Sequence, residues 1–451
     1  HPTMASSSGT KRTREGDEEE DDEPQTGGEG LQEDWSEDDD SEGGRDERDG
    51  GDSESDDSQE EEECFLTACA QGDMEEAKKQ HTAGRADLST GDAEEGDTPL
   101  GVACRFGHLA MGQWLHECGA ALEQPNNAGE TPLHEAALKG HLPVVKWLLP
   151  LLSAAQRNAH SEAGMTALCF ACLGGHVEVA EELLAAGAST AAVDSEGHSL
   201  MHLACTNGRL PMAERLHALG LPLEAGDAQQ RTPLHLAAGQ AELPVSQWLH
   251  GAGAKIDAVD AAGNTPLNFA CAAGAAEVAR WLLSAGAAAT ATNADRNTPL
   301  HYAAQSGEFE LASELIAKGA PPAARNADGD SAFLLACFGG HKAVCELLRD
   351  GGEAVDQVNE MRCSGLLQAC AAGALELAQW LLPQAPSLLE QTDASDTTPL
   401  MHACEQGRLE VVQWLLEQGA TPTAAAAQLA ESQGHADLVK LVKKAVKAHK
   451  S

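Results

Sequence analysis

The sequence predicts an all-α repeat solenoid preceded by a disordered acidic segment. A Thr-Pro-Leu signature or a close variant recurs ten times, at steps of 33 to 35 residues. A Trp followed by Leu stands 16 residues after the start of six copies, and a Cys stands six residues after the start of seven. Because three residue types keep one register, the chain from about residue 64 onward is predicted to be a stack of similar short units.

Each copy begins at the Thr or Ser of the signature. The starts are Thr98, Thr131, Thr166, Ser199, Thr232, Thr265, Thr298, Ser331, Ser364 and Thr398. A Thr or Ser here can accept a backbone N–H at a helix N-terminus, and the Pro that follows gives up only a donor without a helical partner. A Gly nine residues after the start, such as Gly140, permits a turn into a second helix. One such unit is too small to bury its apolar face alone, so neighbouring units must stack.

Negative charge is concentrated at the N-terminal end. The chain contains 72 Asp or Glu and 29 Lys or Arg, for a net charge of −43, and residues 1–63 hold 27 of these acids and 5 of these bases. Few aliphatic residues accompany them, so burial cannot offset the entropy of ordering, and a disordered acidic tail is predicted for 1–63. The charge also excludes a nucleic-acid backbone as the main partner.

Targeting signals and cysteine usage favour the cytoplasm, the nucleus or both. The sequence has no apolar run of about 18 residues, which a membrane-spanning helix would need. Residues 1–30 contain no apolar run that could act as a signal peptide. The 13 Cys are therefore expected to be reduced thiols.

Two segments show the repeat at its clearest. Residues 131–152 read TPLHEAALKGHLPVVKWLLPLL, and residues 298–318 read TPLHYAAQSGEFELASELIAK. They resemble the ankyrin repeat family, whose pattern joins Thr-Pro-Leu-His, Ala-Ala and Gly-His to a second helix that ends in Gly-Ala. The resemblance covers residues 64–448, with ten full repeats and caps at about 64–97 and 424–448, and leaves 449–451 as a tail. It implies two helices and a β-hairpin loop in every repeat.

The resemblance also implies a non-enzymatic protein without catalytic, cofactor-binding or metal-binding residues. Eight Cys occupy one small buried position in successive repeats, about 10 Å apart, which is too far for a disulfide or a shared zinc ion. The six repeat Trp are expected to fill space between helices. Histidines in the TPLH position are expected to support the turn by hydrogen bonding; they are His134, His202, His235, His301 and His402.

Members of the family bind partner proteins on the concave face, through the hairpin tips and the exposed positions of the first helix. Here these positions lie one residue before the repeat start and seven and eight residues after it. The predicted partner-binding residues are Arg105, Phe106, Glu130, Leu138, Lys139, Met165, Leu173, His198, Asn207, Arg231, Asn297, Gln305, Asp330 and Phe338.

Apolar residues at these positions gather near the N-terminal end. Phe106, Leu138, Met165 and Leu173 predict an apolar contact patch, unless a cap or an insertion at 150–160 covers them. The repeat at Thr265 carries only Ala at the two later positions and predicts no feature.

Two functions remain open at this stage. The favoured hypothesis is a monomeric, non-catalytic scaffold or adaptor that binds a protein partner, with a basic partner as one option, and contacts neither nucleic acid nor membrane. In the alternative, the acidic tail binds basic nuclear or chromatin proteins and the solenoid localises it. The repeats at Ser331 and Ser364 lack both Pro and His, so residues 331–397 are predicted to open first.

Overall fold

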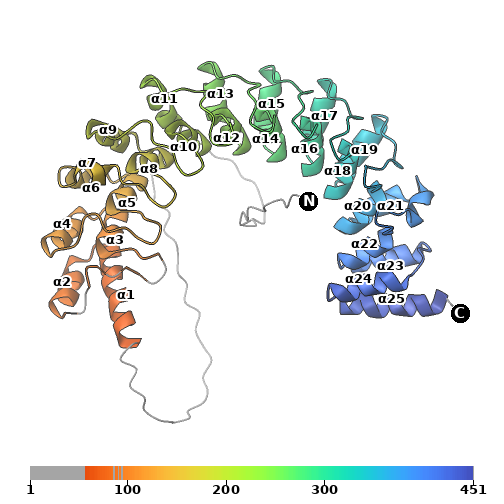
Figure 1. Cartoon of the computed structure of the whole chain (residues 1–451), viewed down its shortest axis with the longest axis horizontal. Coiled ribbons are helices and arrows are strands. Elements are labelled where there is room, and N and C mark those ends of the chain that lie inside the picture. The colour runs from red at the N-terminus through yellow and green to blue at the C-terminus, as the bar shows by residue number, and fades with distance from the viewer. Residues whose placement is uncertain (1–55, 85–86, 90, 93–94, 450–451) are drawn as a thin grey trace, which may run out of the picture. The chain divides into compact units, whose positions relative to one another are not determined.

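The computed structural model describes residues 56–449 except 85–86, 90 and 93–94, with side chains from residue 64 onward. The chain divides into two units, residues 1–53 and 54–451. The described residues belong to the second unit, and the predicted tail lies outside them except for residues 56–63. Within this unit, helices follow one another in pairs from α1 to α25 (Figure 1). This is the all-α repeat solenoid that the sequence predicts.

Ten full repeats each contain a first and a second helix. The first helices are α3 (Pro99–Arg105), α5 (Pro132–Leu138), α8 (Ala167–Gly174), α10 (Leu200–Thr206), α12 (Pro233–Gly239), α14 (Pro266–Ala272), α16 (Pro299–Ser306), α18 (Ala332–Gly339), α20 (Gly365–Ala372) and α22 (Pro399–Glu405). The second helices are α4 (Leu109–Glu117), α6 (Leu142–Leu148), α9 (Val177–Ala185), α11 (Leu210–Ala218), α13 (Leu243–Gly251), α15 (Ala276–Ser284), α17 (Phe309–Ala317), α19 (Lys342–Asp350), α21 (Leu375–Leu381) and α23 (Leu409–Glu417).

A helix pair precedes and another follows these repeats. The pairs are α1 (Asp56–Gln71) with α2 (Met74–Thr82), and α24 (Ala424–Ser432) with α25 (Ala436–His449). Helix α1 includes residues 56–63, which the sequence analysis assigns to the tail. Two facts account for the longer helix: Phe65 and Cys69 are buried against the array, and acidic residues at a helix N-terminus complement its dipole.

Two segments after second helices are longer than usual. The predicted insertion at 150–160 forms the short helix α7 (Ala154–Arg157), which Ser153 and Gln156 cap reciprocally. Arg157 donates to the carbonyl oxygens of Leu152 and Ala186 and so ties α7 to the next repeat. After α21, residues 386–390 form the 3-10 helix η1 (Pro386–Glu390).

Tight turns, rather than extended hairpins, form the tips between repeats. The described residues contain no strands and only three isolated bridges, Val193 with Ser199, Arg325 with Ser331 and Val358 with Ser364. An Asp or Asn five residues before most repeat starts closes the turn, as where Asn126 Oδ1 accepts the N–H groups of Ala128 and Glu130. Each tip also donates one backbone N–H to the tip before it, such as Ala261 N–H to Gln229 O at 2.8 Å.

Four of the five predicted TPLH histidines hold successive repeats together. His134 Nδ1 accepts the Thr131 N–H, and its Nε2 donates to the Ala159 carbonyl oxygen at 3.1 Å. His202, His235 and His301 repeat this arrangement. Because Nδ1 accepts a backbone N–H, each ring is neutral with its proton on Nε2. Burial lowers the pKa of all four and that of His134 to about 4.

The prediction for His402 is wrong. The repeat begins at Thr398, so the third residue after the start is Met401, and His402 stands one position later. Its Nε2 lies 3.0 Å from Asp393 Oδ2 instead of bonding a carbonyl of the next tip. Met401 takes the third position after Thr398, so the His of the TTPLMH segment stands one residue beyond the His of TPLH.

The core is built from Leu, Val, Ala and Cys of both helices. The six repeat Trp are half-buried rather than central, and several rest edge-on against a His of the preceding second helix, such as Trp248 against His217. Burial raises the pKa of Cys104, Cys172, Cys271 and Cys370, so these thiols stay protonated and serve as small apolar groups. Among the helices of the described part, none is both long and apolar enough to cross a membrane.

Candidate functional site

One side of the array carries the first helices and the tips. First helices of neighbouring repeats pack more closely than second helices do, so each junction bends toward the first helices, and we call that side the concave face. The fourth residue after each repeat start lies between neighbouring first helices. In the middle of the array four of these residues are half-buried and apolar or aromatic. We call them the apolar strip: Leu236, Phe269, Tyr302 and Leu335.

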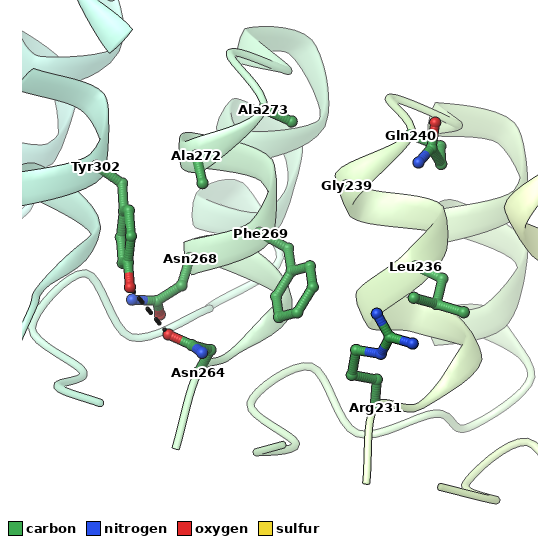
Figure 2. A pocket seen from close by; sticks show the side chains of 10 residues that line it. All are labelled: Arg231, Leu236, Gly239, Gln240, Asn264, Asn268, Phe269, Ala272, Ala273 and Tyr302. Atoms are coloured by element: carbon green, nitrogen blue, oxygen red, sulfur yellow. Dashed lines mark hydrogen bonds between the residues drawn. The ribbon is translucent and has the colours of Figure 1, made fainter. Parts of the chain in front are cut away.

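A pocket of about 440 Å³ opens on this strip between α12, α14 and α16 (Figure 2). Leu236 and Phe269 provide its apolar walls, and Ala272 and Ala273 are exposed at its edge. The prediction that the repeat at Thr265 carries no feature is therefore wrong. Ala272 and Ala273 leave unfilled the space that larger side chains occupy at these positions in most other repeats. Small residues on this helix face therefore create a hollow rather than a flat surface.

A compact polar network closes the tip side of this pocket. Asn293 Nδ2 donates to Asn264 Oδ1 and to the Tyr302 hydroxyl, both at 2.9 Å. The Tyr302 hydroxyl donates to Asn264 Oδ1 at 3.2 Å. Arg231, at the opposite wall, donates from Nε to Asp227 Oδ2 at 2.6 Å. These hydrogen bonds position the two rims of the pocket.

Asn268 lies in the position that His occupies in the neighbouring repeats. Its Oδ1 accepts from the backbone N–H and the hydroxyl of Thr265, as the His Nδ1 does elsewhere. The shorter side chain does not reach the next tip, and its Nδ2 is buried without a hydrogen-bond partner among the described residues. Asn268 is 2% exposed and lines the pocket. A buried amide donor in this state costs free energy, which a ligand acceptor would recover.

A second, acidic pocket lies among the N-terminal tips. It has a volume of about 510 Å³, and its lining includes Glu95, Arg105, Glu130 and Glu162. Arg105 pairs with Glu95, Asp97 and Glu135 at 2.6 to 2.8 Å, and the hydrogen bond to Glu135 raises the pKa of the guanidinium. Burial and the nearby Glu135 carboxylate raise the pKa of Glu130 to about 7. Carboxylates outnumber the single cation here, so the pocket favours a positively charged group of a ligand.

The predicted partner-binding residues divide into three groups by exposure. Phe106, Lys139, Asn207, Gln305 and Phe338 are exposed, and Phe106 and Phe338 reach 53% and 57%. The half-buried group consists of Arg105, Glu130, Leu138, Met165, Leu173, His198, Arg231 and Asn297. Asp330 is buried, which corrects the expectation that it faces a partner.

Asp330 is buried because its position joins adjacent tips. Asn359 Nδ2 donates to Asp330 Oδ1 at 2.9 Å, and Asn326 Nδ2 donates in the same way to Asn297 Oδ1. In the middle of the array, Arg231 lies 3.0 Å from His198 Nε2. Residues one position before the repeat start therefore hold the fold together, which the sequence analysis did not anticipate.

The predicted N-terminal apolar patch consists of one exposed ring and three half-buried side chains. Phe106 projects from the C-terminal end of α3. Leu138, Met165 and Leu173 instead pack against the core. Sequence reasoning missed the fourth position after each start, although the run Leu236, Phe269, Tyr302, Leu335 is visible there in the sequence.

Clustered metal ligands do not occur in the part of the chain that the structure describes. Two buried cysteines, Cys337 and Cys345, lie with their Sγ atoms 3.6 Å apart within one repeat, on its two helices.

Models of known protein families match most of the chain from residue 65 onward. Models described as ankyrin repeats (3 copies) match residues 65–155, 149–221, 335–426 and 366–450. Models described as ankyrin repeats (many copies) match residues 250–303 and 300–349. The chain belongs to the ankyrin repeat family. Ankyrin repeats are protein–protein interaction modules, and the family is typically non-catalytic.

One solved structure that is similar to this chain is the crystal structure of the human ASB11 ankyrin repeat domain. It is 30% identical to this chain, and the match covers 50% of this chain and 99% of that chain, with a TM-score of 0.45. No curated protein matched this ankyrin repeat chain.

Proposed function

We propose that this protein is a non-catalytic adaptor of the cytoplasm or nucleus that binds a partner polypeptide along its concave face. The observation that carries the proposal is the apolar strip of four half-buried side chains in consecutive repeats, three of which line a pocket of about 440 Å³. A contiguous apolar surface rimmed by polar groups is typical of protein-binding sites.

The charge of the N-terminal tips favours a partner that is basic at one end. Glu95, Glu130, Glu162 and Glu196 place one carboxylate on each of four successive tips, and three of them are exposed. Charge complementarity of this kind orients a partner and speeds its association. The proposed partner therefore lays apolar residues along the strip and basic residues toward α3 and α5.

Selection of binding peptides tests this function. A displayed library of random peptides is selected on the full chain, and affinities are measured for wild type, Phe269→Glu and Leu335→Glu. We expect each strip variant to weaken binding by at least about tenfold, because a charge replaces an apolar contact. The matched control is Phe309→Glu on α17, an exposed Phe of a second helix.

The control variant should bind like wild type. Peptides enriched in Lys or Arg toward one end, with affinity that falls as salt rises, would support the basic partner. If the strip variants and the control bind equally well, the concave face is not the binding surface and the proposal fails. Removal of residues 1–55 is expected to leave the affinity unchanged.

A further inference from the structure

We propose that the pocket between α12, α14 and α16 recognises an apolar side chain of an extended partner segment, and that a neighbouring main-chain carbonyl of this segment accepts a hydrogen bond from Asn268. This inference rests on the proposed function and gives it a specific contact. It starts from Asn268, whose buried Nδ2 lacks a hydrogen-bond partner among the described residues that surround it.

The orientation of the Asn268 amide is fixed by the fold. Its oxygen must face Thr265, because the Thr265 backbone N–H can only donate and lies 3.3 Å from Oδ1. The NH₂ group therefore faces away from Thr265. Figure 2 shows the amide between the Tyr302 and Phe269 side chains, within the group of residues that line the pocket.

Apart from Gln240, which is exposed at the edge, the other polar groups of the pocket leave little hydrogen-bonding capacity for a different ligand. Asn264 Oδ1 accepts from Asn293 and Tyr302, and Asn264 Nδ2 donates to Asp260 Oδ2. The Asn268 amide is thus a free donor in a ring of satisfied groups. A ligand that fits this ring presents an acceptor.

A neutral acceptor suits the pocket better than a carboxylate. Arg231 is the only charged residue that lines it among the described residues. Asp227 at 2.6 Å and Glu196 at 3.6 Å balance its charge. The chain as a whole carries a net charge of −43. A carboxylate would enter against this field without a cation of its own, whereas a carbonyl oxygen is uncharged and accepts the same N–H.

The shape of the site favours a polypeptide over an isolated small molecule. Three residues of the apolar strip line the pocket, and the fourth, Leu335 in α18, is the half-buried strip residue of the next repeat. An extended segment can place one side chain between Leu236 and Phe269 and still follow the strip across neighbouring repeats. Its backbone also carries a carbonyl at every residue, so an acceptor is always close to the anchoring side chain.

Tyr302 provides a built-in reporter for this binding. It is the only Tyr of the chain, and its hydroxyl lies at the polar rim of the pocket. The Asn268 Nδ2 has almost no solvent-exposed surface, so the ligand carbonyl reaches it when the half-buried Tyr302 ring moves aside. A fluorotyrosine incorporated in place of tyrosine gives a single ¹⁹F resonance from this site.

The experiment measures peptide binding and the fluorotyrosine resonance together. The probes are the peptides selected on the full chain, and the variants are Asn268→His and Asn268→Asp. The His variant restores the side chain of the neighbouring repeats, whose Nε2 donates to the next tip, and so withdraws the donor from the pocket. The Asp variant keeps the oxygen that accepts from Thr265 and deletes the NH₂ group.

We expect both variants to lower peptide affinity about tenfold, the value of one hydrogen bond to a buried donor. Wild type should show a shifted fluorotyrosine resonance at saturation, and the His variant should also melt at a higher temperature than wild type. His134→Asn is the matched control, since it makes the reverse exchange far from the pocket. It should lower the melting temperature and leave affinity unchanged.

The outcomes separate the two proposals. Peptides that depend on Phe269 but bind wild type and both Asn268 variants equally would overturn the role of Asn268 and leave the concave-face function standing. A small molecule that shifts the fluorotyrosine resonance while no selected peptide does would overturn the polypeptide ligand. If no selected peptide depends on the apolar strip, both proposals fail together.

Discussion

The repeat at Thr265 differs from its two neighbours in the third residue after the repeat start, and this difference separates a closed junction from an open one. In the repeats at Thr232 and Thr298, His235 and His301 reach across to carbonyl oxygens of the next tip at 3.0 and 3.2 Å. In the repeat between them, Asn268 makes the same bonds within its own repeat but none across the junction. The shorter side chain of Asn268 thus lacks the hydrogen bond to the next repeat, and its Nδ2 remains an unpaired donor beside the pocket.

The comparison teaches that a repeat array can create a binding feature where one repeat lacks a hydrogen bond that its neighbours make. The helices, caps and tip bonds of the Thr265 repeat match those of its neighbours. Stacking interactions from both sides support the junction, so the loss of one cross-repeat bond is tolerated. Four predictions test this reading, from the largest expected effect to the smallest.

Acidification should destabilise the closed junctions first. The pKa of His134 is about 4 in the folded chain and about 6.5 in the unfolded chain, so the unfolded state binds more protons between these values and stability falls as pH drops below 6.5. We expect a loss of about 2 kcal/mol from His134 alone between pH 7 and pH 5, with further losses from His202, His235 and His301. Urea denaturation at both pH values measures it, and equal stability would contradict it.

Conversion of a closed junction into an open one should have the next largest effect. His301→Asn removes the bond to the Asp330 carbonyl oxygen and is expected to cost about 2 kcal/mol, because a buried acceptor loses its donor. The free energy of unfolding from urea denaturation checks this. The exposed substitution Gln305→Asn, on the same helix, serves as the control. A His301→Asn protein as stable as wild type would show that the cross-repeat bond has no energetic role.

Replacement of Glu130 should reveal a titration of opposite sign at the N-terminal tips. The pKa of Glu130 is about 7 in the folded chain, above its unfolded value, so the folded state binds more protons and stability falls as pH rises through 7. Glu130→Gln, which stays neutral, is expected to be about 1 kcal/mol more stable than wild type at pH 8 and equal at pH 4, after a discount for solvent screening. The same difference at both pH values would exclude this titration.

Hydrogen exchange should show the smallest difference, along the array. The repeats at Ser331 and Ser364 carry Leu334 and Leu367 where the repeats at Ser199, Thr232 and Thr298 carry His, so residues 331–397 lack these cross-repeat bonds. Each missing bond is expected to lower the local opening free energy by roughly 0.5 kcal/mol relative to residues 199–330. A segment at 331–397 that exchanges more slowly than 199–330 would contradict the prediction.

The period of the sequence was sufficient to predict the fold. Thr, Trp and Cys at fixed offsets located both helices of every full repeat, because local capping and apolar spacing act within one repeat and do not depend on distant residues. The TPLH histidines were placed correctly at four positions. His402 was not, since Met401 takes the third position after Thr398 and places the His one residue later.

The candidate site was predicted less well, because it depends on what neighbouring repeats leave empty. Ala272 and Ala273 look featureless in a sequence, and only the stacked helices show the hollow between Leu236 and Phe269. Asp330 shows the opposite error: a charged residue at a position expected to be exposed is buried by a side-chain bond from Asn359 in the next tip. Bonds between repeats follow three-dimensional spacing, which a one-dimensional period does not contain. The substitution of Asn for His at residue 268 was the one visible signal.

The backbone bond from each tip to the one before it has a consequence for how such surfaces diversify. These bonds run from Asn127 N–H to Glu95 O through to Ala394 N–H to Met361 O, all at 2.7 to 3.0 Å. Every residue type possesses these main-chain atoms. The spacing between neighbouring tips therefore does not depend on which residues occupy the tips. Exposed side chains on the tips that take no part in the turns or in the bonds between tips can therefore change while these backbone bonds stay in place, so a new binding specificity does not require a new scaffold.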